Sequence, residues 1–147
     1  MPERRNTLKS GVRTPAQTLR VPWKKSSAVE VRRAVVSELQ RLEVDATVVD
    51  ETETVLSELV SNAVRHARPL PDGTIRVSWT VRGGVVEVEV TDGGGPTTPR
   101  PAPQSLWSAN GRGLRIVRSF AHEWGVSEDR IGRTVWVSLG GPSRRRL

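Results

Sequence analysis

The sequence predicts an α/β fold: a two-layer sandwich in which a mixed, mainly antiparallel sheet carries helices on one face. Three observations lead to this prediction. Two stretches with helical spacing of apolar residues fill most of residues 27–67, strictly alternating apolar residues follow at 74–92, and a short helical pattern with two further strand patterns lies beyond them. At 147 residues the chain suits one domain that is large enough to bury a hydrophobic core.

The first helix is predicted over residues 27–42. It opens on Ser-Ala-Val-Glu, from Ser27 to Glu30, which matches a capping box with a serine at the N-cap and a glutamate three residues later. Its apolar residues keep the three- and four-residue spacing of a helix that buries one face. These residues are Ala28, Val31, Val35, Leu39 and Leu42.

The second helix is predicted over residues 47–67, where the segment Arg-Pro-Leu-Pro-Asp-Gly ends it. Its apolar stripe consists of Val49, Thr52, Leu56, Leu59, Val60, Ala63 and Ala67. Four polar residues lie within an arc of about 100° along one border of this stripe. They are Glu58, Asn62, Arg65 and His66. Each one alone is most simply part of a solvated border, but together with the features below they indicate a binding site.

Two of these side chains suit a nucleotide site. The carboxamide of Asn62 can offer an oxygen to Mg²⁺, a hard cation that takes one or two protein oxygens together with phosphate and water. The carboxylate of Glu58, one turn earlier, can hold a water or a hydroxyl group for in-line attack on phosphorus. We therefore expect this helix to form the floor of a nucleotide site.

A β-hairpin is predicted over residues 74–92, with Gly83 and Gly84 as its two-residue loop. This loop would pair Val81 with Val86, Trp79 with Val88, Val77 with Val90, and Ile75 with Asp92. Asp92 would then share the core-facing side with three valines, where a carboxylate costs several kcal/mol unless a polar group meets it. Two interpretations stay open: Asp92 caps the following turn, or it is a buried acceptor for a donor on a ligand.

A long Gly/Pro-rich connection, residues 93–112, follows the hairpin and is typical of a lid or a binding loop. Gly111 and Gly113 precede a helix predicted over 113–121, which carries Leu114, Val117 and Phe120 at core spacing. Backbone N–H groups at such a helix start suit phosphate, although a plain turn is the simpler interpretation of the glycine pair alone. Glu-Trp-Gly-Val-Ser-Glu and Arg-Thr-Val-Trp-Val-Ser-Leu predict two more strands around the turn Asp-Arg-Ile-Gly.

The positive charge of the chain, formally +7, is concentrated toward its two ends. Residues 1–25 hold seven basic residues and one acidic residue, residues 144–146 are three arginines, and residues 26–143 hold 13 basic and 15 acidic residues. The nearly neutral central part disfavours nucleic-acid binding as the main function. No run of 18 apolar residues predicts a membrane span, and the start lacks the apolar region of a secretion signal. Together with the absence of cysteine, this leads us to expect a cytoplasmic protein.

Four motifs in order carry a resemblance to a known family. Glu58 to Ala67 resembles the N-box of the Bergerat-fold, histidine-kinase-like ATP-binding proteins. Asp-Gly-Gly-Gly-Pro and Gly-Arg-Gly-Leu-Arg-Ile-Val resemble their two glycine boxes, and Gly132 to Trp136 resembles their final strand motif. The chain is most similar to the anti-sigma-factor serine kinases and their actinobacterial relatives. The resemblance covers about residues 18–140 and leaves basic tails at 1–17 and 141–147.

On the helix, the resemblance implies that Asn62 coordinates a Mg²⁺ ion that bridges the phosphates of ATP. It also implies that Glu58 is the general base that activates an acceptor serine. Arg65 matches a position often held by a basic residue that faces phosphate. We expect His66 to be a packing residue and not a ligand.

For the base, the resemblance implies that Asp92 accepts from the adenine amino group, that Gly94 lets the base approach, and that Thr134 supports adenine through Asp92 and a water. The phosphates would be held under the lid by the start of the third helix, from residues Gly111, Arg112, Gly113 and Leu114. Whether Arg100 or Arg112 meets the γ-phosphate stays open.

The function implied is an ATP-dependent protein-serine kinase that acts as an anti-sigma factor, with a sigma factor and an anti-sigma-factor antagonist as partners. A homodimer is a further possibility that the resemblance implies. The alternative is an ATP-dependent module that binds a partner without turnover, and Glu58 favours the kinase because a pure binder needs no base. The absence of a phospho-accepting histidine domain disfavours autokinase chemistry of the two-component kind.

Overall fold

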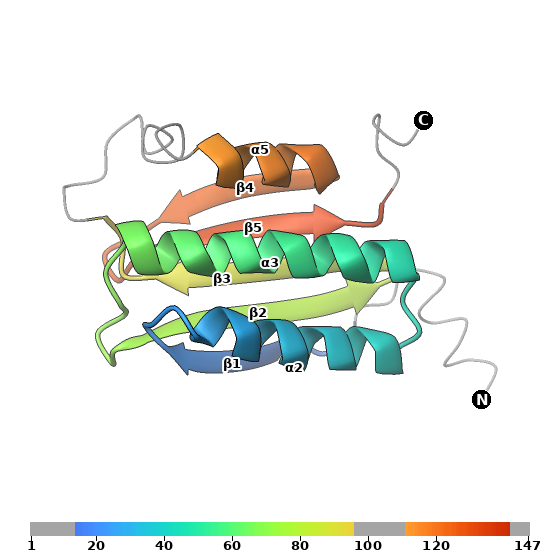
Figure 1. The fold of residues 1–147 in the computed structure, drawn as a ribbon, viewed down its shortest axis with the longest axis horizontal. Helices are drawn as coiled ribbons and strands as arrows, with labels where there is room; N and C mark the ends of the chain where they lie inside the picture. Colours follow the sequence, from blue (N-terminus) through green and yellow to red (C-terminus); the bar gives the residue numbers. More distant parts are fainter. Residues whose placement is uncertain (1–13, 96–110, 142–147) are drawn as a thin grey trace.

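The structure of the chain is a computed structural model, which describes residues 14–95 and 111–141. In these residues, five strands form one sheet, and three helices lie on one face of it (Figure 1). The expected two-layer α/β sandwich is therefore confirmed. Most of the two basic tails, and residues 96–110 of the expected lid, lie outside the described residues.

The sheet has the order β1-β2-β3-β5-β4, and each described pairing of neighbouring strands is antiparallel. The parallel component of the expected mixed sheet is thus not present in the described part of the chain. The strands are β1 (Gln17–Pro22), β2 (Thr74–Arg82), β3 (Val85–Asp92), β4 (Glu123–Glu128) and β5 (Arg133–Leu139). The pattern of the sequence did not predict β1, because this edge strand buries Val21 and leaves most of its other residues exposed.

The hairpin has the predicted register. Val77 pairs with Val90, Trp79 with Val88, and Val81 with Val86. Gly83 and Gly84 both have positive φ, 56° and 84°, as the tight two-residue turn requires. The ladder between β2 and β3 ends at Arg76 and Thr91, so the expected fourth pair does not form, and Asp92 pairs instead with Arg133 of β5.

The helices are α2 (Ser27–Arg41), α3 (Ala46–His66) and α5 (Gly111–Phe120), each within two residues of the predicted bounds. The helix α3 lies between the other two and packs on the sheet through buried residues such as Val55, Leu56 and Leu59 (Figure 1). Its N-cap is Asp45, whose carboxylate accepts from the backbone N–H of Thr47.

The predicted capping box at the start of α2 is wrong. The N-cap is Ser26, which makes no side-chain capping hydrogen bond, and Ser27 is already helical. The hydroxyl of Ser27 is buried and donates to the carbonyl oxygen of Pro22 at the end of β1. A contact with the neighbouring strand has therefore replaced the local cap, and it ties α2 to the sheet edge.

Two glycines allow the end of β3 to approach its neighbours closely. A Cβ atom on Gly93 would lie 2.1 Å from the carbonyl oxygen of Pro69, and one on Gly132 would lie 1.9 Å from the carbonyl oxygen of Asp92. No real Cβ atom is found at such distances from backbone. The sequence Gly-Gly after Asp92 and the glycine before Arg133 thus allow β3, β5 and the loop after α3 to meet.

We expect Gly132→Ala to lower the free energy of unfolding by about 1–3 kcal/mol, because the added methyl forces two backbones apart. Urea unfolding measures the change. The matched control is Thr80→Ala on the helix-free face of β2, which should shift stability by about 0.5 kcal/mol or less. Equal stability of Gly132→Ala and the wild type would contradict the close approach.

Candidate functional site

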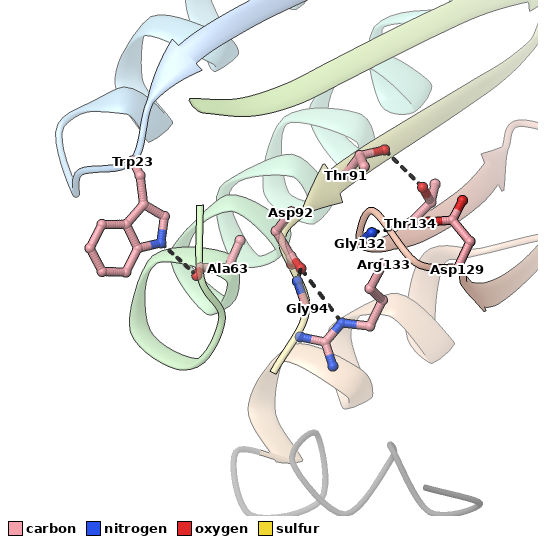
Figure 2. A network of polar contacts seen from close by, with 9 residues as sticks. All are labelled: Trp23, Ala63, Thr91, Asp92, Gly94, Asp129, Gly132, Arg133 and Thr134. Atoms are coloured by element: carbon pink, nitrogen blue, oxygen red, sulfur yellow. Dashed lines mark hydrogen bonds and ion pairs between the residues drawn. The ribbon is translucent and has the colours of Figure 1, made fainter. Parts of the chain in front are cut away.

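Several of the elements that carry the predicted site residues meet at one end of the sandwich. The C-terminal end of α3, the end of β3, the start of β5 and the start of α5 all lie at the left side of Figure 1. Figure 2 shows this end from close by, with Asp92 and Arg133 beside each other and Gly94 next to them. The antiparallel order of β3 and β5 brings Asp92 and Arg133 together, because they are the paired residues at that end of the ladder.

Asp92 lies buried on the helix-facing side of the sheet, as its position in the alternating pattern predicted. Its Oδ1 accepts from the backbone N–H of Gly94 at 2.7 Å, so the turn-capping interpretation describes a contact that exists. The same Oδ1 is the carboxylate oxygen nearest to Nε of Arg133. Within residues 14–95 and 111–141, no hydrogen-bond donor to Oδ2 is seen. One oxygen holds the turn, which leaves the other for a ligand.

Burial raises the pKa of the Asp92 carboxyl above its ordinary value. The positive charge of Arg133 and the hydrogen bond from Gly94 oppose this effect, and the negative charge of Glu128 adds to it. The site thus holds a carboxylate that is costly to bury and that two neighbours help to keep ionised. Such carboxylates are more common at functional sites than in ordinary cores.

Arg133 is a residue beside Asp92 that the sequence did not predict for the site. It is buried beside Asp92, with Arg133 Nε 3.8 Å from Asp92 Oδ1, and this distance is too long for a hydrogen bond. The pattern held a sign of it, because Arg133 alternates with Val135 and Val137 on the core-facing side of its strand.

Thr134, predicted to support the base through Asp92, is not brought to that carboxylate. Its side chain lies on the opposite face of the sheet, where its hydroxyl is hydrogen-bonded to that of Thr91 at 2.8 Å (Figure 2). The strand alternation places Arg133, and not Thr134, next to Asp92.

The polar border of α3 is present as predicted. Asn62 is only 3% exposed, and its Oδ1 accepts from Nη2 of Arg65 at 2.9 Å. Among the described residues, its buried Nδ2 has no hydrogen-bond partner, and the same holds for Nε2 of His66 one turn further on. Glu58 is half-buried one turn earlier, while Arg65 is exposed. Buried polar atoms without a protein partner are expected where a ligand completes the hydrogen bonding.

The first glycine box has a defined backbone geometry. The N–H of Gly93 donates to the carbonyl of Arg68, and the N–H of Arg68 donates to the carbonyl of Gly94, at 2.7 and 2.8 Å. Gly94 has φ of +87°, which residues with side chains rarely adopt, and no atom of the described residues lies within 4 Å of where its Cβ would be. The loop after β3 is thus fixed to the end of α3, and Gly94 leaves open space beside Asp92.

The second glycine box opens α5. Gly111 and Gly113 lie within the first turn of this helix, which begins two residues earlier than predicted. The backbone of Arg112 and Leu114 belongs to the same turn, and their side chains lie outside the described part. Arg100 and the predicted lid at 96–110 also lie outside it. The start of α5 is at the same end of the sandwich as Asp92 (Figure 1).

Trp23 is another residue near this end to which the sequence analysis gave no role. Its indole Nε1 donates to the carbonyl oxygen of Ala63 on α3 at 3.2 Å, although the residue is 39% exposed (Figure 2). This bond holds the loop between β1 and α2 against the last turns of α3, and its acceptor, Ala63, directly follows Asn62 in the sequence.

The donor set fits a Mg²⁺–nucleotide complex better than a protein-held metal. Among the described residues there is no group of three or more His, Cys, Asp or Glu side chains that could hold a metal. Asn62 offers a single amide oxygen, as expected for Mg²⁺ that keeps phosphate and water ligands. In the described structure that oxygen accepts from Arg65, which places a positive charge beside the oxygen proposed for the metal.

Comparison with known proteins gives the family of a chain with this fold and this glycine-rich end. The chain belongs to the histidine kinase-like ATPase domain family, whose model matches residues 21–139. The fold is also similar to part of a chain in the crystal structure of the RsbU and RsbW domains of Rv1364c from Mycobacterium tuberculosis, with a TM-score of 0.66 and 23% sequence identity. That match covers 89% of this chain but 34% of the other, so this chain spans about a third of its length. No curated protein matches the chain.

In the described part of the chain, none of the helices combines the length and the apolar character needed to cross a membrane.

Proposed function

We propose that this protein binds Mg²⁺-ATP and transfers its γ-phosphate to a serine of a partner protein. The observation that carries the proposal is the arrangement at one end of the sandwich. A buried carboxylate acceptor, Asp92, lies at the same end as Asn62 and the start of α5, and Glu58 lies one turn before Asn62 on α3. These are the groups that base recognition, metal binding and activation of a hydroxyl require.

Each group has one role in this proposal. Asp92 accepts from the amino group of adenine, and Gly94 leaves the space that the base needs. Asn62 offers Oδ1 to Mg²⁺, which supplies charge neutralisation of the phosphates when it is bound, and Arg65 turns from Asn62 toward phosphate. Backbone N–H groups from Gly111 to Leu114 at the start of α5 hold phosphate oxygens. Glu58 takes the proton of the serine hydroxyl.

The biological setting we propose is a partner-switching pathway in the cytoplasm. The protein would act as an anti-sigma factor that binds a sigma factor, and its kinase substrate would be an anti-sigma-factor antagonist. The fold shared with the RsbW-containing structure supports this setting. A homodimer is compatible with it, and the domain that folds would extend over residues 18–140 between basic tails.

The alternative function is binding of a partner in response to ATP without turnover. One observation favours it: the oxygen of Asn62 that would meet the metal is held by Arg65. An experiment separates the two functions. The full chain is first titrated with Mg²⁺-ATP by calorimetry and then incubated with γ-labelled ATP and candidate antagonist proteins. Label on a serine of an antagonist supports the kinase, whereas ATP binding with partner capture and no label supports the alternative.

A further inference from the structure

The ends of β3 and β5 carry a pair of buried opposite charges that pack without a hydrogen bond. Asp92 and Arg133 are register partners, and their side chains are 5% and 3% exposed. Buried arginine–carboxylate pairs are normally held by short, often bidentate hydrogen bonds. Here the carboxylate directs Oδ1 to the N–H of Gly94, and Arg133 Nε stays 3.8 Å away.

This arrangement leaves a hydrogen-bond donor of Arg133 unsatisfied. Its Nε–H is buried and has no hydrogen-bond partner in residues 14–95 and 111–141. A buried donor without an acceptor costs about 1–3 kcal/mol, so native structures contain few of them. The donor lies on the helix-facing side of the sheet beside Asp92, in the part of the site that the proposed function assigns to the base (Figure 2).

We propose that Arg133 is a second base-reading residue, which donates to a ring nitrogen of adenine next to the amino group that Asp92 accepts from. This inference rests on the proposed ATP binding. Asp92 and Arg133 place an acceptor and a donor side by side, and adenine presents the complement, an amino donor beside a nitrogen acceptor. Guanine presents two acceptors along the edge that carries its O6 and N7, so one of them would face the carboxylate of Asp92.

Arg133 also supports the role of Asp92. Its positive charge is the largest of the effects that lower the pKa of the Asp92 carboxyl, which burial raises. Arg133 thereby favours the ionised carboxylate, in which both oxygens are acceptors, so that one can accept from Gly94 and the other from an amino group. Arg133 would therefore contribute to base recognition in two ways: it donates to the base, and it keeps the Asp92 carboxylate ionised as an acceptor.

The test measures binding of base analogues to the full chain by calorimetry in Mg²⁺. The ligands are ATP and its 7-deaza and 1-deaza analogues, each of which lacks one of the two ring nitrogens beside the amino group. We expect the wild type to bind one analogue about tenfold more weakly than ATP, since a hydrogen bond from a charged donor is lost. In Arg133→Met, which has no donor, that ratio should fall to about one.

Controls separate this inference from the proposed function. Arg82→Met removes an exposed arginine at the end of β2 and should keep the wild-type ratios. If Arg133→Met fails to fold, Arg133→Lys carries the test, because its ammonium lacks the planar fork and should lower the ratio. If the wild type binds both analogues as tightly as ATP, the role of Arg133 is overturned, while the proposed ATP binding stands. An unchanged ratio in the Arg133 variants also overturns it. Absence of ATP binding to the wild type overturns both.

Discussion

Glu58→Gln is expected to lower the rate of phosphotransfer by about 10²–10⁴-fold while Mg²⁺-ATP binding stays nearly unchanged. Glu58 is half-buried on the border of α3, one turn before Asn62. A general base acts on the attacking hydroxyl in the transition state, so its loss affects the chemical step more than the bound ground state. Glutamine keeps the size of the side chain and removes only the base.

Single-turnover transfer from labelled ATP to an antagonist protein measures the rate, and calorimetry measures binding. The control is Glu53→Gln on the same helix, which should not affect transfer. Oε2 of Glu53 lies 3.9 Å from Nε of Arg32 at the surface. Full transfer by Glu58→Gln would show that another group, or no protein group, removes the proton. Loss of ATP binding in this variant would show that Glu58 holds the nucleotide instead.

Asn62→Ala is expected to weaken Mg²⁺-dependent ATP binding by about tenfold or more, about 1.4 kcal/mol. The substitution removes the amide oxygen proposed for the metal, so binding measured in excess chelator should change much less. The protein should unfold at the same temperature as the wild type or at a higher one. The reason is that the variant removes a buried Nδ2 that has no partner in the part of the chain that the structure describes, and the Arg65 side chain that it releases is exposed.

Weaker ligand binding without a loss of stability is expected of a residue that is kept for a ligand. Ser61→Ala, the preceding residue on α3, serves as the control and should leave Mg²⁺-ATP affinity and melting temperature within the error of the wild type. Equal loss of ATP affinity with and without Mg²⁺ would place Asn62 against the nucleotide and not against the metal.

The elements with strong periodicity could be predicted from the sequence. The helices α2 and α3 and the register of the β2–β3 hairpin follow from alternating or helical apolar positions, and two glycines set the hairpin turn. The strand β1 could not be predicted in this way, because an edge strand that buries one residue fully has no pattern. The predicted Ser27 cap is wrong because the helix already begins at Ser27, whose hydroxyl donates to Pro22 at the end of β1.

In the site, too, strand alternation predicted which side a residue faces, whereas individual contacts depend on the folded structure. The core-facing side of Asp92 followed from strand alternation, and the same alternation applied to β5 would have selected Arg133. Thr134 was chosen instead from a resembling motif, which carries no information about which face a side chain takes here. The bond between Arg65 and Asn62 joins residues three apart on a helix, a spacing that places side chains within reach but does not fix which atoms bond.

The central claim, that this end of the sandwich is an ATP site in which Asp92 reads the base, is tested most directly by calorimetric titration of the full chain. The titration compares ATP, ADP and GTP in excess Mg²⁺. We expect ATP and ADP to bind and GTP to bind more weakly by about 1–3 kcal/mol, since a guanine carbonyl would face the carboxylate and leave acceptors unpaired. Equal affinity for GTP, or no binding of ATP, would contradict it.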